Sequence, residues 1–156
     1  MRWLVLFLLY GCFSSNPCAS VTSADLDRGS LDTAQAVPVE NGSALWKSGT
    51  LSMDAPEAWY TYNATAGIFN TIDPFVKVEQ GGLVVCAYQS CAFSQCPGGT
   101  YDDVAPNGAH GCCASAPIEF QIFGCGDSQD TVWMSVTSPH AETAKVCAGY
   151  KLGYNW

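Results

Sequence analysis

Short runs of alternating apolar and polar residues, separated by Gly, Pro, Asn and Asp, fill most of the chain from residue 44 onward. Alternation with a period of two is typical of β-strands that bury one face. The pattern therefore predicts an all-β protein, a sandwich or a barrel. The predicted strands are Ala44–Leu51, Ala58–Asn63, Phe75–Val78, Leu83–Tyr88, Ile118–Phe123, Thr131–Thr137 and Val146–Tyr154.

The connections between these runs give three further expectations. The turn sequence Gln80-Gly81-Gly82 lies between Phe75–Val78 and Leu83–Tyr88, so we expect these two strands to form a hairpin. The best helix candidate is Leu31–Val39, which is short and contains Pro38. The stretch from Ser90 to Ala116 is rich in Cys and Gly and poor in aliphatic residues, which predicts a long loop ordered by disulfides.

The N-terminus has the pattern of an export signal. Met1-Arg2 precedes the apolar run Trp3–Tyr10, which ends at Gly11-Cys12. This run is too short for a membrane-spanning helix, which needs about 20 apolar residues. We therefore expect a signal peptide over 1–11, a tether over 12–30, and one domain over 31–156 that matures outside the cytosol, where thiols oxidise.

Two cleavage sites compete in this region. Leu9-Tyr10-Gly11-Cys12 resembles the lipobox of bacterial lipoproteins, in which the cysteine is alkylated by a lipid and the chain is cut just before it. The alternative is an ordinary signal-peptidase site after Ser20. The chain has nine cysteines. An anchor at Cys12 leaves an even number to pair, whereas cleavage after Ser20 leaves an odd number, so parity favours lipid attachment at Cys12.

Disulfides are the expected state of the other cysteines. Cys112 and Cys113 are adjacent, so each should pair with a different partner. A metal site or a Cys–His nucleophile with His110 is the alternative, but no C-x-x-C pair gives the usual zinc spacing. The preferred arrangement ties Cys86, Cys125 and Cys147 to the loop group Cys91, Cys96, Cys112 and Cys113, with Cys18 joining the arm to the domain.

Charge excludes one class of partner and suggests one kind of site. The formal net charge is −8, with 6 Lys and Arg against 14 Asp and Glu, so the chain lacks the basic surface that nucleic acid requires. Acidic residues of the arm and of a later turn are candidate calcium ligands. The alternative is that they form solvated turns without an ion, so no cofactor is expected. The candidates are Asp25, Asp27, Asp32, Asp127 and Asp130.

Aromatic side chains on the predicted strands are candidates for a binding face. They are Trp46, Trp59, Tyr60, Tyr62 and Trp133. Core packing is the commoner role of aromatic residues in strands. Successive side chains of a strand point to opposite faces, however, so Trp59 or Tyr60 must face outward or lie under a second layer.

The order of several short motifs carries a family resemblance. They are Leu31-Asp32-Thr33-Ala34-Gln35-Ala36-Val37, Ser48-Gly49-Thr50-Leu51, Ala58-Trp59-Tyr60-Thr61-Tyr62, Thr65-Ala66-Gly67, Thr131–Val136 and Tyr150-Lys151-Leu152. This order resembles the bacterial pre-peptidase C-terminal (PPC) domain, in a Cys-rich variant met in predicted myxobacterial lipoproteins. Ala58 stands where the family usually has an aspartate. The resemblance implies a single jelly-roll-like β-sandwich and a non-catalytic module.

These observations predict a non-enzymatic exported binding module, lipid-anchored at the outer surface or in the periplasm, with a protein or carbohydrate ligand at the cell surface. Its only membrane contact would be the lipid, and full secretion is the alternative location. One alternative function is a structural subunit of an extracellular fibre or coat. A second is a small secreted hydrolase, for which the chain lacks the G-x-S-x-G motif.

Overall fold

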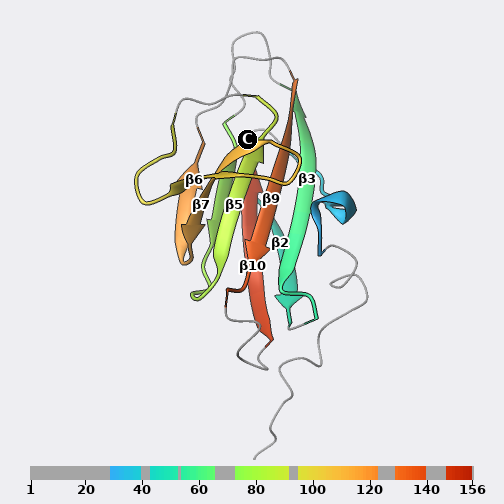
Figure 1. Cartoon of the computed structure of the whole chain (residues 1–156), viewed down its shortest axis with the longest axis vertical. Coiled ribbons are helices and arrows are strands. Elements are labelled where there is room, and N and C mark those ends of the chain that lie inside the picture. The colour runs from blue at the N-terminus through green and yellow to red at the C-terminus, as the bar shows by residue number, and fades with distance from the viewer. Residues whose placement is uncertain are drawn as a thin grey trace, which may run out of the picture.

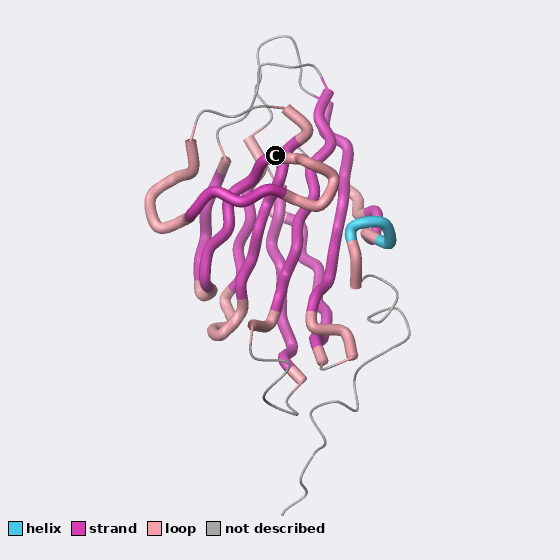
Figure 2. Tube along the Cα trace, viewed as in Figure 1, coloured by secondary structure: helices cyan, strands magenta, loops and turns pink. Residues whose placement is uncertain are grey.

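The computed structural model describes residues 29–39, 43–52, 54–65, 73–91, 95–122, 129–139 and 147–155. Within these ranges the chain forms two β-sheets in a sandwich, which confirms the predicted fold class (Figures 1 and 2). The elements are the 3-10 turn η2 (Leu31–Thr33) and the strands β1 (Gln35–Ala36), β2 (Leu45–Leu51), β3 (Glu57–Thr65), β4 (Phe75–Val78), β5 (Val84–Gln89), β6 (Tyr101–Val104), β7 (His110–Ser115), β8 (Ile118–Gln121), β9 (Gln129–Thr137) and β10 (Ala148–Asn155). In these ranges no helix is long and apolar enough to cross a membrane.

The chain crosses repeatedly between the two layers, as in a jelly roll. The larger sheet has six strands in the order β1-β3-β9-β5-β7-β6, and the smaller has four in the order β2-β10-β4-β8. Consecutive strands from β2 to β5 and from β8 to β10 therefore lie in alternate sheets. β1 runs parallel to β3, and the other strand pairs are antiparallel.

The core lies between the sheets and follows from the two-residue alternation. Tyr60 and Met134 from the larger sheet and Leu152 from the smaller sheet are fully buried there. Fully burying a side chain such as Leu contributes about 1.5–3 kcal/mol. The hydroxyl oxygens of Tyr60 and Tyr150 are 2.5 Å apart, so a hydrogen bond joins β3 to β10 inside the core. This bond keeps two buried hydroxyls paired and links the sheets.

A second apolar layer covers the outer face of the six-stranded sheet. Trp59 and Tyr88 stack there with ring centroids 5.6 Å apart, and each is 3% exposed. Ala105 and Ala109, from the loop after β6, pack on this cluster. Figure 1 shows β6 and this loop crossing in front of β5 and β9. Trp59 and Tyr60 are therefore both buried, because the outward-facing member lies under this second layer.

The predicted hairpin between Phe75–Val78 and Leu83–Tyr88 is wrong. The first run forms β4 in the smaller sheet, and the second forms β5 in the larger sheet. The turn itself is present, and Gly82 adopts φ of 78°, which glycine tolerates without strain. The Gly-Gly signal specified a reversal of the chain, but it did not decide whether the flanking strands would pair.

Two other segments differ from expectation. Only Leu31–Thr33 of the helix candidate is helical, as a single 3-10 turn before β1. The predicted loop from Ser90 to Ala116 contains the antiparallel pair β6 and β7. β7 escaped detection because its small residues, from Gly111 to Ala114, are buried on both faces and show no polar alternation.

Candidate functional site

The described cysteines are disulfide-bonded. Cys86 pairs with Cys113, and Cys96 pairs with Cys112, so the adjacent cysteines have different partners, as predicted. Cys86–Cys113 follows the preferred arrangement, but Cys96–Cys112 joins two members of the expected loop group, so that part was wrong. The reason is that Cys112 and Cys113 sit on opposite faces of a strand. Cys91 and Cys147 are also bonded, while Cys12, Cys18 and Cys125 lie outside the described residues.

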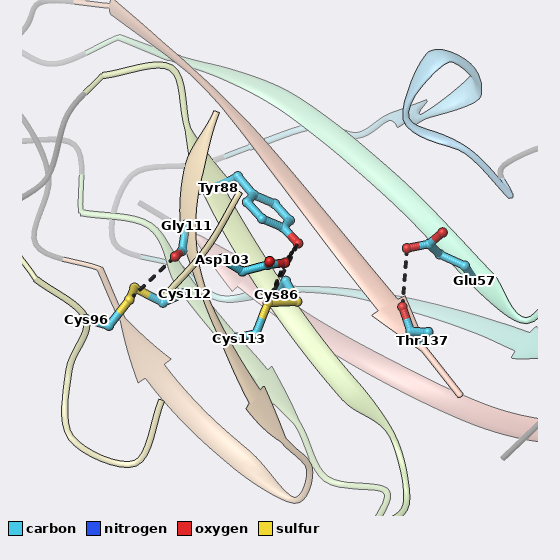
Figure 3. Close-up of a disulfide and its surroundings, with 9 residues drawn as sticks. All are labelled: Glu57, Cys86, Tyr88, Cys96, Asp103, Gly111, Cys112, Cys113 and Thr137. Atoms are coloured by element: carbon cyan, nitrogen blue, oxygen red, sulfur yellow. Dashed lines mark hydrogen bonds between the residues drawn. A yellow bond between two sulfur atoms is a disulfide. The ribbon is translucent and has the colours of Figure 1, made fainter. Parts of the chain in front are cut away.

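The Cys86–Cys113 disulfide lies beside a tyrosine–aspartate pair in the second apolar layer (Figure 3). The hydroxyl of Tyr88 donates to Oδ2 of Asp103 at 2.8 Å. Burial, followed by this hydrogen bond and the charge of Asp103, raises the pKa of Tyr88. Sγ of Cys113 is 3.4 Å from the same oxygen, a sulfur–oxygen contact without a shared hydrogen because disulfide sulfur carries none.

This chemistry overturns the metal and nucleophile alternatives for Cys112 and Cys113. Metal binding and nucleophilic attack require a thiolate, and both sulfurs are in disulfides. Asp102 and Asp103 lie near these sulfurs, but a carboxylate beside a disulfide does not make a metal site. His110, at the start of β7, is exposed.

The predicted aromatic binding face does not form. Trp59, Tyr60 and Tyr62 are all 3% exposed or less, and Trp133 is half-buried beside Tyr88 and Trp59. The cause is the layering of the sheet, because one face packs on the core and the other on the second apolar layer. Of the five candidates, Trp46 alone is exposed, at 41%.

The structure separates the two described calcium candidates. Asp32 is exposed in η2, beside β3, whereas Asp130 is buried near the start of β9. Asp25, Asp27 and Asp127 lie outside the described residues. Calcium at the arm group that includes Asp32, or at the turn that includes Asp130, stays a prediction.

A polar pocket opens where β3 ends and β9 begins, at the upper end of these strands in Figure 1. Its volume is about 290 Å³. The antiparallel register places Asn63 opposite Thr131 and Thr65 opposite Gln129, so the strand ends supply paired polar side chains. The pocket is lined by Asn63, Ala64, Thr65, Ser90, Gln129, Asp130 and Thr131.

The hydrogen bonds of Ser90 fix the carboxylate of Asp130 at this pocket. The backbone N–H of Ser90 donates to Oδ1 of Asp130 at 3.1 Å, and the Ser90 hydroxyl donates to the same oxygen. The Ser90 hydroxyl in turn accepts the backbone N–H of Thr131 at 3.3 Å. The end of β5 is thereby connected to the start of β9, and the Asp130 side chain is held 96% buried, since its exposure is 4%.

The other carboxylate oxygen of Asp130 differs in its surroundings. Sγ of Cys91 is 3.5 Å from Oδ2, but a bonded sulfur has no hydrogen to donate. Among the described residues, no N–H or O–H donor reaches Oδ2, and no Lys or Arg forms an ion pair with Asp130. Burial, and to a smaller extent the charge of Asp130, raises the pKa of Tyr62. The pocket therefore contains a buried acceptor that suits a ligand with hydrogen-bond donors.

Asp130 is the one lining residue that the sequence had suggested as a ligand-binding residue. Asn63 and Thr65 were visible as polar ends of a predicted strand, but nothing local indicated that they lie opposite Thr131 and Gln129. Ser90 was assigned to a loop. Their proximity depends on the pairing of β3 with β9, which connects positions 68 residues apart.

Comparisons with known proteins add little to this site. No family model matches the chain, and no curated protein matches it. The resemblance to the PPC domain therefore stays a prediction. Among solved structures, one similar chain is Salmonella Typhimurium PliG, a periplasmic lysozyme inhibitor of g-type lysozyme, with 13% identity and a TM-score of 0.40 over 78% of this chain and 98% of that chain. A likeness this low carries no argument about function.

Proposed function

We propose that this protein is a non-enzymatic binding domain that acts outside the cytosol and holds a small, hydroxyl-rich ligand in the pocket at Asp130. The observation that carries the proposal is the side chain of Asp130, which lines the pocket, is buried, and has one oxygen, Oδ2, that no described N–H or O–H donor reaches. Leaving a buried charged acceptor unpaired is costly, and a ligand hydroxyl would pair it. A sugar unit is the ligand class that this chemistry favours.

The rest of the lining fits a sugar. The side-chain amides of Asn63 and Gln129 both donate and accept, and the hydroxyls of Thr65 and Thr131 do the same. Ligand pockets commonly measure about 300–1,000 Å³, so this one, at about 290 Å³, suits a ligand of roughly one sugar ring. Thr131 donates to Oδ1 of Asn63 at 2.9 Å, which orients that amide before any ligand arrives.

The arrangement of Ser90 and Asp130 argues against a hydrolase. In a Ser-His-Asp triad a histidine lies between the nucleophile and the carboxylate. Here the hydroxyl of Ser90 donates directly to Asp130. His110 is opposite Gln89 in the sheet, one residue from Ser90, yet among the described residues it bonds neither Ser90 nor Asp130. Among the described residues, the hydroxyl of Ser90 therefore lacks the histidine that the triad uses as its general base.

The structural-subunit alternative has weaker support. β6 is an edge strand whose four residues are exposed, including Tyr101 and Val104. Its other two residues, Asp102 and Asp103, place carboxylates along the edge. Like charges disfavour pairing of this edge with a second copy of itself.

Export and anchoring form a separate part of the proposal. The disulfides Cys86–Cys113 and Cys96–Cys112 support maturation in an oxidising compartment. Intact mass of the mature protein tests the anchor. We expect a chain that begins at Cys12 with added diacylglycerol mass, and a chain that begins at Val21 without modification would rule the anchor out.

The pocket is tested by titrating the protein with mono- and disaccharides while following its amide NMR signals. We expect Asp130→Asn, Asn63→Ala and Gln129→Ala each to weaken binding at least tenfold, which corresponds to about 1.4 kcal/mol. Asp130→Asn keeps an acceptor for Ser90, so the fold should survive. The matched control is Gln121→Ala, which removes an exposed amide from β8 and should leave binding unchanged. The proposed binding site would be overturned if the parent protein bound no saccharide, or if the three pocket variants bound saccharide as tightly as the parent does.

A further inference from the structure

The outer face of the four-stranded sheet presents an exposed indole. Trp46 in β2 is opposite Gly153 in β10, and side chains at these positions point away from the core. Trp46 is 41% exposed, although large apolar side chains on the other strands are mostly buried. An exposed Trp on a strand is a common anchor for ligands, because it offers a large, rigid contact area.

A lysine that forms no ion pair within the described part of the chain lies on this indole. Nζ of Lys151 is 4.5 Å from the ring centroid of Trp46, which is a cation–π contact. Lys77, on the same face, bonds Glu119 at 3.2 Å and Glu79 at 3.5 Å. Among the described residues Lys151 has no such carboxylate partner. Its charge is therefore available to an anion, in a chain whose net charge is −8.

The Trp46 ring packs directly on the backbone of β10, at a position where the chain has a glycine. A Cβ atom at Gly153 would lie 2.9–3.1 Å from three carbons of the Trp46 ring, so a side chain there would push the ring off the strand. The side chain of Gln80 accepts the backbone N–H of Lys151 at 2.8 Å, which holds β10 in place next to Trp46. Gly149 leaves the adjoining outward position without a side chain. The indole and the lysine are thus held in place on a nearly flat part of the sheet surface.

We propose that this face, defined by Trp46, Ser48, Gly149, Lys151 and Gly153, binds a polysaccharide that carries carboxylate groups, such as a polymer of uronic acids. A pyranose ring would pack its C–H face on the part of the indole that is exposed beside Lys151, and its carboxylate would pair with the Lys151 ammonium. The partner is chosen by charge complementarity, because Lys151 has no carboxylate partner among the described residues and the net charge of the chain is −8. A low-relief aromatic platform suits a sugar chain better than an acidic protein, since protein anchors usually enter pockets.

This surface is separate from the Asp130 pocket, which is on the other sheet. The two proposals can therefore fail independently. Asp130→Asn should weaken saccharide binding in the pocket at least tenfold and leave the binding of acidic polymers unchanged.

The test is a titration of the full-length mature protein with a hexamer of galacturonic acid, followed by Trp fluorescence and calorimetry. We expect Trp46→Ala and Lys151→Gln each to weaken binding at least tenfold, and we expect the affinity to fall with salt. The first matched control is Tyr101→Ala, which removes a 52% exposed aromatic residue from β6. The second is Lys47→Gln, which removes a lysine from β2, and both controls should bind as the parent does.

Three probes decide the outcome. The uronic-acid hexamer should bind more tightly than a neutral glucan hexamer of the same length and more tightly than a hexapeptide of Glu. Equal binding of the neutral glucan would remove the role assigned to Lys151. Preferential binding of the Glu peptide would assign the face to an acidic protein and overturn the proposal, as would no binding of the uronic-acid hexamer at millimolar concentration.

Discussion

The strands of the four-stranded sheet carry three lysines and one glutamate, whereas those of the six-stranded sheet carry three aspartates, one glutamate and no lysine or arginine. The outer faces differ as well. The six-stranded sheet is covered by a second apolar layer that contains the Cys86–Cys113 disulfide, while the four-stranded sheet exposes Trp46. Both sheets share one core. One sheet therefore has acidic strands under a crosslinked outer layer, whereas the other has more lysine than glutamate on its strands and an exposed aromatic side chain.

The largest expected effect comes from removing the crosslinks of the six-stranded sheet. In the chain-entropy model, loops of 27 and 16 residues predict losses of about 3.5 kcal/mol for Cys86→Ala with Cys113→Ala and about 3 kcal/mol for Cys96→Ala with Cys112→Ala. Urea unfolding of both double variants measures the free energies. Unchanged midpoints would show that the second apolar layer, rather than the crosslinks, stabilises this sheet.

Substitution of one glycine in each sheet tests how tightly the two sheets are packed. A Cβ at Gly111 in β7 would collide with the carbonyl oxygen of Ala87 and the ring of Tyr88, whereas one at Gly149 in β10 meets nothing within 4 Å. We expect Gly111→Ala to cost about 3 kcal/mol, at the high end for overpacking. Gly149→Ala should change stability by less than about 0.5 kcal/mol. Thermal unfolding of the two variants measures the contrast, and similar melting temperatures would contradict it.

The junction of the sheets is tested at the Tyr60–Tyr150 hydrogen bond. Either Tyr60→Phe or Tyr150→Phe leaves a buried hydroxyl with one partner fewer, at a cost of about 1–2 kcal/mol. The double variant should cost less than the sum, with a coupling of about 1 kcal/mol in a double-mutant cycle. Strict additivity in chemical denaturation would mean that this bond does not couple the sheets.

The smallest effect concerns alkaline pH. Burial raises the pKa of Tyr62 and Tyr88 above the value of about 10 for an unfolded chain. Because the folded state keeps these phenols protonated, their contribution is complete below pH 10 and is lost as the pH rises above it. Each such tyrosine adds a slope of up to about 1.4 kcal/mol per pH unit. Tyr88→Phe should make the fall in stability from pH 10 to 11 shallower, whereas Tyr101→Phe, at an exposed position, should not.

Features of the fold that depend on neighbouring residues could be predicted from the sequence, and features that depend on distant residues could not. Strand positions such as β4 and β9 followed from local alternation, since one face of each meets a core. β7 did not, because Cys112, Cys113 and their neighbours are buried on both faces. The disulfide state of the described cysteines had been expected from the pattern of an export signal, but the pairing of Cys96 with Cys112 required the strand geometry.

For the candidate sites, individual residues could be predicted from the sequence, but their burial and their neighbours could not. Asp130 was visible in the sequence as an acidic turn residue, but its burial and its bonds to Ser90 arise from the pairing of β5 and β3 with β9. Trp46 was one of five aromatic candidates, and nothing local distinguished it from Trp59. The second apolar layer made that distinction by covering Trp59 and leaving Trp46 exposed.

Strands, the turns at Gly, Pro and Asn, and the crosslinking of the described cysteines could be predicted from the residues alone, because they depend on neighbouring residues and on the chemistry of thiols. The pairing of the strands, the exposure of each aromatic residue and the polar groups that meet at the Asp130 pocket could be seen in the folded chain alone. Those features depend on contacts between residues far apart in the chain, where sheet register sets the distances and local pattern carries no information.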